Sequence, residues 1–138
     1  MSHNSASNDL IVITDDVPLM AELVQYNLEL TGFKNSITFN NPEICLKHIR
    51  DGLRPAVVIS DFQMPEMDGI ELLNSIGILL PECTGIIMSS NPRMALAQKP
   101  PYPILKKGSS DFFSSLISLI CEALGTKCDH HNWRVIRS

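Results

Sequence analysis

The chain has 138 residues, of which 44% are hydrophobic and 19% charged, and its formal net charge is −4 at pH 7. These values predict one globular domain, and they exclude a disordered chain or two ordinary domains. The acidic balance argues against a DNA-binding surface, and the apolar runs are far too short to span a membrane. The four cysteines form no C-x-x-C pair, which argues against a disulfide framework. Together with the absence of an apolar leader, this predicts a cytoplasmic protein.

Strand-like and helix-like segments alternate along the chain. Short apolar runs predict five strands, at residues 10–13, 36–39, 56–60, 85–88 and 104–105. Apolar residues at helical spacing predict helices at 18–31, from Pro42 to Gly52, at 69–80 and at 110–125. Between the fourth and fifth strands, Pro92 and the pair Pro100-Pro101 leave a helical window of only residues 93–98. The fourth helix is therefore expected to be shortened.

Five strand–helix units in series predict an α/β fold, a parallel sheet wound on both faces by helices. The strand segments are continuous apolar runs, which suits strands buried on both faces. In such a sheet the functional residues lie at the carboxyl ends of the strands. The residues that follow each predicted strand are therefore the candidates for a site.

Polar side chains follow four of the predicted strands. They are Asp15 and Asp16, Asp61, Ser89 and Ser90, and the pair Lys106-Lys107. Each one alone is most often a turn or helix-capping residue. Carboxylates brought together at one edge of a sheet repel one another, and Mg²⁺, which prefers oxygen ligands, relieves that repulsion. Because they recur at several strand ends, the sequence predicts a Mg²⁺ site there.

The run from Asp61 to Gly69, DFQMPEMDG, matches the D-x-x-M-P-x-M-D-G motif of the response regulator receiver domains at every fixed position. Over residues 10–124 the chain resembles this family of two-component and phosphorelay signalling, which includes the chemotaxis regulator. The resemblance implies a flavodoxin-like (βα)5 fold with strand order 2-1-3-4-5. It also implies that Asp61 accepts a phosphoryl group from a sensor histidine kinase or a phosphotransfer protein.

The resemblance implies a role for each candidate side chain. Asp15, Asp16, Asp61 and the backbone carbonyl of Gln63 would hold Mg²⁺. Ser89 stands at the position of the switch hydroxyl, and Ser90 fits the small residue beside the phosphoryl group.

The resemblance also places Lys106 at the position of the lysine that follows the fifth strand. The family has a proline in a cis bond after that lysine, whereas this chain has Lys107. A non-proline cis bond costs roughly 2.5–4 kcal/mol, so we expect either a strained cis bond or a trans bond with a reshaped loop. The family's aromatic switch position, three residues before the lysine, is Pro103, beside Tyr102.

Two other classes of protein fit parts of the pattern. A phosphohydrolase of the haloacid dehalogenase type also uses an aspartate after a buried strand, but it needs a second aspartate two residues later, where this chain has Gln63. A pseudo-receiver has the same fold but is not phosphorylated and acts only as an interaction module. Binding of beryllofluoride with Mg²⁺ distinguishes a phosphoacceptor from a pseudo-receiver.

The predicted organisation is a disordered segment at 1–9, a receiver domain at 10–125 and a tail at 126–138. No DNA-binding module follows, so we expect a signalling module that acts through proteins and is not a turnover enzyme. The last helix, which contains Leu119 and Ile120, is apolar beyond one stripe, and this predicts a homodimer or partner interface. The alternative is that these side chains pack under the shortened segment or under the tail. Trp133 and the basic ending that follows it either dock on the domain or are disordered.

Overall fold

The computed structural model describes residues 8–126 of the chain, so most of the predicted N-terminal segment and tail lie outside the described residues. Five strands form one parallel sheet in the order β2-β1-β3-β4-β5. The strands are β1 (Ile11–Thr14), β2 (Ser36–Phe39), β3 (Val57–Asp61), β4 (Thr84–Ser89) and β5 (Ile104–Lys106). The helices are α1 (Pro18–Leu30), α2 (Pro42–Arg50), α3 (Gly69–Leu79), α4 (Arg93–Ala97) and α5 (Phe112–Leu124). The predicted doubly wound fold, its strand order and the short α4 are confirmed.

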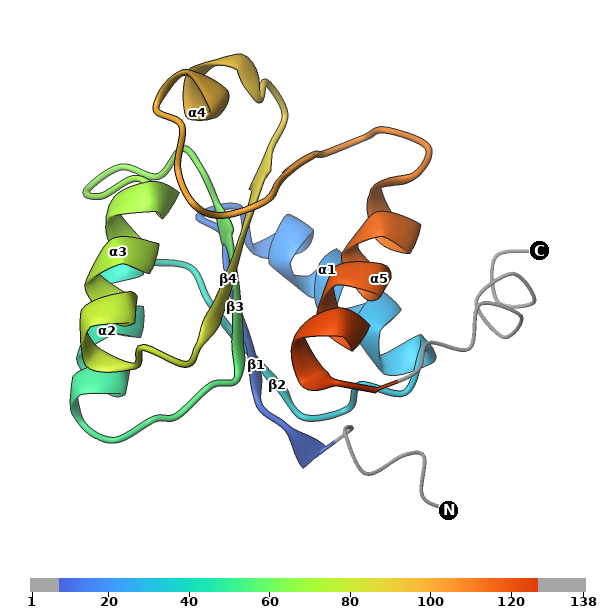
Figure 1. The fold of residues 1–138 in the computed structure, drawn as a ribbon, viewed down its shortest axis with the longest axis horizontal. Coiled ribbons are helices and arrows are strands. Elements are labelled where there is room, and N and C mark those ends of the chain that lie inside the picture. Colours follow the sequence, from blue (N-terminus) through green and yellow to red (C-terminus); the bar gives the residue numbers. More distant parts are fainter. Residues whose placement is uncertain (1–7, 127–138) are drawn as a thin grey trace.

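Helices cover both faces of the sheet, with α2 and α3 on one face and α1 and α5 on the other (Figure 1). Successive residues of β1 point to opposite faces: Ile11 and Ile13 pack with α1 and α5, whereas Val12 packs with α2 and α3. A strand that feeds two cores has no solvent-facing side. This is why the strands are continuous apolar runs in the sequence.

The helices begin at the residues that the sequence marks as starts. Asn41 caps α2 by accepting the backbone N–H groups of Glu43 and Ile44 at 2.8 and 3.0 Å. Asp68 and Glu71 form a reciprocal capping box at the start of α3. Asp68 and Gly69 belong to the motif that begins at Asp61, so one contiguous motif contains both the end of β3 and the start of α3.

The apolar side chains of α5 pack more completely than expected. Phe112, Leu116, Ile117 and Ile120 are buried in the cluster shared with α1, and Leu119 is partly buried against it. They pack in one cluster with the sheet and α1, whereas the packing alternative named the shortened segment or the tail as their cover. Within residues 8–126, a regular stripe of exposed large apolar residues lies on α1 instead.

The sequence argues against a disulfide framework, and the cysteines depart from that expectation. Cys45 and Cys83 are free, but Cys121 in α5 is disulfide-bonded. The absence of C-x-x-C spacing does not exclude such a bond, because the pairing of distant cysteines depends on the fold. Among the described helices, none is long and apolar enough to cross a membrane.

Candidate functional site

Three carboxylates meet at the carboxyl edge of the sheet. Asp15 and Asp16 follow β1, Asp61 ends β3, and one carboxylate oxygen of each lies within 4.8 Å of the others. β1 and β3 are neighbours in parallel register, with Thr14 opposite Ser60, so the next residues of the two strands must lie side by side. Asp15 is fully buried and Asp61 is 7% exposed, whereas Asp16 faces solvent. The sequence thus predicted this cluster from strand ends alone.

Lys107 neutralises part of this charge. Its ammonium nitrogen lies 2.8 Å from Oδ2 of Asp15 and 2.8 Å from Oδ1 of Asp61. Burial disfavours the charged form of Lys107, but the hydrogen bonds to Asp15 and Asp61 prevail and raise its pKa above the ordinary value. The ammonium group is therefore charged and fixed between the two buried carboxylates.

The resemblance placed Lys106 as the lysine of the site, which would reach the phosphoryl group on Asp61, but the lysine that contacts Asp61 is Lys107. Lys106 is opposite Ser89 as the last residue of β5, and its side chain is exposed. The backbone N–H of Lys107 donates to the Ser89 carbonyl at 2.8 Å, which brings the residue after the strand over the edge of the sheet. The described residues contain no cis peptide bond, so the trans alternative with a reshaped loop holds. Gly108, at φ +82°, turns the chain directly after Lys107.

The change of lysine also moves the position of the aromatic switch residue. Three residues before Lys107 stands Ile104, so this position is not aromatic under either assignment. Tyr102 is held elsewhere, because its hydroxyl donates to Oδ1 of Asn74 in α3 at 2.5 Å. The adjacent lysines Lys106 and Lys107 were the signal in the sequence that either one could be the lysine that contacts Asp61.

Burial dominates the electrostatics of Asp61. It raises the pKa of Asp61 above the ordinary value, the hydrogen bond from Lys107 opposes this, and the charges of Asp15 and Asp16 raise the pKa further. Asp15 is more fully satisfied, since the N–H of Val17 donates to its Oδ1 at 2.9 Å while Lys107 binds its Oδ2. One lysine does not relieve the repulsion at Asp61, so this carboxylate favours a further cation.

The donor set therefore fits a hard divalent cation. Clustered carboxylate oxygens, one of them exposed and open to solvent, suit an ion that keeps several waters. Asp15, Asp16 and Asp61 could hold such an ion. Gln63, whose backbone carbonyl is the further predicted ligand, lies in the exposed loop two residues after Asp61.

The loop after β3 is tight because Gly69 packs against Asp61. The N–H of Gly69 donates to the Phe62 carbonyl at 2.8 Å, and a Cβ on Gly69 would overlap the carbonyl oxygen of Asp61. No larger residue fits without moving the backbone of Asp61. The glycine of the sequence motif is thus explained by close approach.

Ser89 lies at the end of β4, one residue beyond the register partner of Asp61, and is 3% exposed. Its hydroxyl oxygen accepts the N–H of Asn91 at 3.1 Å. Ser90 is exposed beside it. Both residues are therefore at the edge of the sheet where the carboxylates meet.

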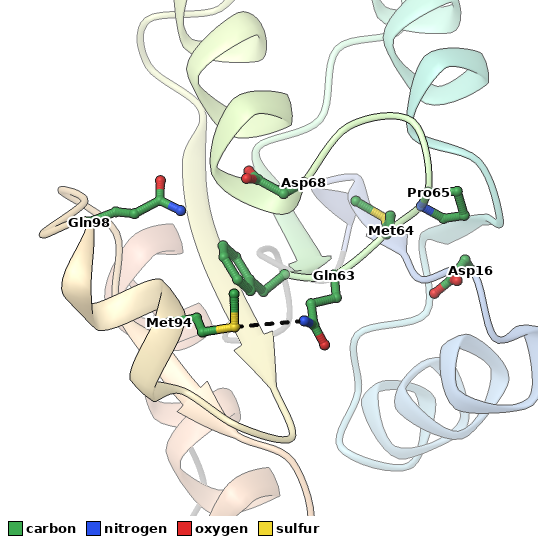
Figure 2. A pocket seen from close by; sticks show the side chains of 8 residues that line it. Asp16, Gln63, Met64, Pro65, Asp68, Met94 and Gln98 are labelled. Atoms are coloured by element: carbon green, nitrogen blue, oxygen red, sulfur yellow. Dashed lines mark hydrogen bonds between the residues drawn. The ribbon is translucent and has the colours of Figure 1, made fainter.

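A cavity of about 490 Å³ lies beside the carboxylates, between the loop after β3 and α4. Figure 2 shows Gln63 pointing across it toward Met94 of α4, with the side-chain nitrogen 4.0 Å from the methionine sulfur and Asp16 on the other side. The five-residue α4 forms one wall of this cavity through Met94 and Gln98.

Comparison with known proteins identifies the class of protein that this fold and site define. The profile of the response regulator receiver domain matches residues 11–114, and the chain belongs to this family of two-component signalling. A 65-residue segment is 35% identical to the alkaline phosphatase synthesis transcriptional regulatory protein PhoP of Bacillus subtilis (strain 168). The match covers 47% of this chain and 26% of PhoP, so it spans about a quarter of that protein's length.

Two solved structures illustrate the likeness in fold. The signal receiver domain of a signal transduction histidine kinase from Syntrophus aciditrophicus is 27% identical with a TM-score of 0.72, over 85% of this chain and 90% of that one. A response regulator receiver protein from Sinorhizobium medicae WSM419 is 18% identical with a TM-score of 0.75, over 85% of this chain and 94% of that one. The second, at this identity, shows the fold alone.

Proposed function

We propose that this chain is a phosphoacceptor receiver, in which Asp61 takes a phosphoryl group from the phosphohistidine of a sensor histidine kinase or a phosphotransfer protein. The observation that carries the proposal is the placement of Asp61: it is held at a strand end between two carboxylates and a lysine ammonium. A carboxylate is a competent nucleophile toward phosphorus when the surrounding charge is neutralised. A receiver of this kind is a signalling module and not a turnover enzyme.

In the proposed transfer, an oxygen of Asp61 forms a bond to phosphorus while the phosphorus–nitrogen bond of the donor histidine breaks. The electron pair of that bond stays on the leaving imidazole. Asp15, Asp16, Asp61 and the Gln63 carbonyl would hold Mg²⁺, which when bound neutralises charge on the phosphoryl oxygens. Lys107, in place of Lys106, supplies the fixed positive charge beside Asp61.

Ser89 is proposed as the switch residue. Its oxygen already accepts from Asn91, so its hydroxyl proton can be donated to a phosphoryl oxygen on Asp61. Such a bond would draw the segment after β4 toward the site, a local change with a wider effect on the surface around α4. Phosphorylation would thereby control a protein–protein interaction in the cytoplasm, without DNA or membrane contact by this domain.

A homodimer through α5 remains a prediction. The partly exposed Leu119 is the residue to change, because Ile120 is fully buried and its substitution would unfold the domain. Sedimentation of Leu119→Glu against the unaltered chain tests the prediction, and a monomer in both cases contradicts it.

The phosphorylation assay uses acetyl phosphate and Mg²⁺ with the whole chain. One phosphoryl group, seen as a mass shift, should appear on the unaltered protein and be absent from Asp61→Asn. Beryllofluoride with Mg²⁺ should bind the unaltered protein. If neither reagent reacts with a folded protein, the alternative of a pseudo-receiver interaction module is correct. Labelling that persists in Asp61→Asn would place the phosphoryl group elsewhere.

A further inference from the structure

Helix α1 carries an exposed apolar stripe along its whole length. Leu19, Leu23, Tyr26 and Leu30 recur three or four residues apart, so they share one face of the helix. Their exposed fractions are 75%, 45%, 58% and 41%, while Ala21, Val24 and Leu28 on the opposite face are buried against the sheet. Such a stripe is unusual on a surface helix, whose solvent face is ordinarily polar.

The stripe is bordered by acidic groups. Glu22 and Glu29 are exposed and seven residues apart, and α1 contains no lysine or arginine. The surface therefore favours a partner that is both apolar and basic. The requirement for both properties restricts the segments that could bind this surface more than a requirement for hydrophobicity alone.

From these features we infer that residues 127–138 of the same chain bind along α1. This segment, KCDHHNWRVIRS, contains three basic residues against one acidic residue, and it contains the apolar residues Trp133, Val135 and Ile136. Its apolar and basic side chains complement the leucines, the tyrosine and the glutamates of α1. The segment and the stripe are thus matched in both properties.

The segment starts at the edge of the sheet where α1 ends. Helices α1 and α5 pack in one cluster on the same face of the sheet, and both run antiparallel to the strands, so their C-terminal ends lie at the same edge (Figure 1). Thr126, the last described residue, follows α5 by two residues and therefore lies at the edge of the sheet where α1 ends. Seven residues beyond it, an extended chain reaches at most about 25 Å, and the 13 residues of α1 span about 20 Å. The segment is accordingly long enough to lie along α1.

Two other groups of exposed apolar residues are less accessible to this segment. Ile78 and Leu79 end α3, on the face of the sheet opposite α5, and Met94 and Leu96 lie on α4, at the opposite edge from Thr126. A chain that leaves α5 would have to pass to the other face of the sheet, or run along the whole length of the strands, to reach them. The positive charge of the segment and the position at which it starts both favour α1.

Binding here would affect access to the acidic site, a consequence that rests on the proposed function. α1 begins two residues after Asp16, so the stripe extends from the rim of the carboxylate cluster. A protein that brings a phosphohistidine to Asp61 needs space at that rim, whereas acetyl phosphate does not. The bound segment would therefore hinder protein donors selectively.

Trp133 is the only tryptophan of the chain, so its fluorescence reports this contact directly. In the whole protein we expect emission at shorter wavelength and weaker acrylamide quenching than in a synthetic peptide of residues 127–138. The double substitution Leu19→Lys with Tyr26→Lys should shift both values to those of the free peptide, and so should Glu22→Lys with Glu29→Lys. All four side chains are exposed, so the fold should persist, as circular dichroism can verify.

The matched control is Ile78→Lys, because this residue is 82% exposed on the other face of the sheet and should leave Trp133 protected. The inference is overturned if Trp133 in the unaltered chain already matches the free peptide, or if only Ile78→Lys releases it. Protection that disappears on dilution would assign the contact to a second copy and would also overturn binding within one chain. None of these measurements involves phosphorylation, so their failure is independent of a failure of acetyl phosphate labelling.

Discussion

The ammonium nitrogen of Lys107 lies 2.8 Å from Oδ1 of Asp61, across the gap between the end of β5 and the end of β3. Strands β3 and β5 are not neighbours, since β4 lies between them. The lysine side chain therefore crosses the edge of the sheet past β4, and its ion pair with Asp61 joins the end of β5 to the end of β3. The pair is largely shielded from solvent, with side-chain exposures of 15% and 10%.

Lys107→Ala should destabilise the metal-free domain by on the order of 3 kcal/mol, because it leaves the buried carboxylates of Asp15 and Asp61 without their counter-ion. It should also reduce labelling of Asp61 by acetyl phosphate. Urea unfolding and the mass-shift assay measure the two effects. The neighbouring Lys106→Ala is the control and should change stability by less than about 0.5 kcal/mol, because that side chain is exposed. If Lys106→Ala were the more damaging change, the sequence-based assignment would be restored.

Mg²⁺ should stabilise the domain, because it binds the folded cluster and not the unfolded chain. At a concentration of 100 times its dissociation constant, the gain is about 2.7 kcal/mol. Asp16→Asn should abolish this gain while slightly raising the metal-free stability, since it removes one repelling charge. Thermal melts with and without Mg²⁺ measure both. Glu66→Gln, in the same loop region but outside the cluster, should keep the full response, and a loss there would point to a nonspecific charge effect.

Gly69→Ala should destabilise the domain by roughly 1–3 kcal/mol and weaken labelling of Asp61, because the new methyl group overlaps the Asp61 carbonyl and forces its backbone to move. Gly77→Ala is a matched control on the same helix. It has open space around it and an ordinary helical position, so it should stabilise α3 by about 1 kcal/mol. Equal effects of the two substitutions on labelling would show that the contact at Gly69 does not position Asp61.

The free thiols should make stability fall at alkaline pH. Burial raises the pKa of Cys45 and of Cys83 from 9.0 to about 11, against a smaller opposing hydrogen bond in each case. A pKa that is higher in the folded state means that stability is complete below pH 9 and is lost as the pH rises through about 11. Thiolate absorbance should show that the two thiols titrate near pH 11 in the native protein and near pH 9 in urea. Native thiolates formed already at pH 9 would contradict the burial of these two side chains.

The sequence by itself determined the elements of this protein and most of its site. Periodicity is a local property, so strands buried on both faces and amphipathic helices were visible without a structure, as was the short α4 between its prolines. Asp15, Asp16 and Asp61 were brought together by topology alone, because parallel strands place their carboxyl ends at one edge. The motif from Asp61 to Gly69 is likewise contiguous in the chain.

Only the tertiary structure decided between Lys106 and Lys107. The choice depends on the hydrogen-bond register of β5 against β4, and a shift by one residue exchanges which side chain points to the site. The structure likewise decided which helix exposes apolar surface. Both α1 and α5 are rich in apolar residues, but α5 buries its side chains against the sheet and α1, whereas Leu19 and Tyr26 of α1 have no described neighbour to cover them. Composition gives the amount of apolar surface in a helix, and the packing of distant elements determines how much of it is buried.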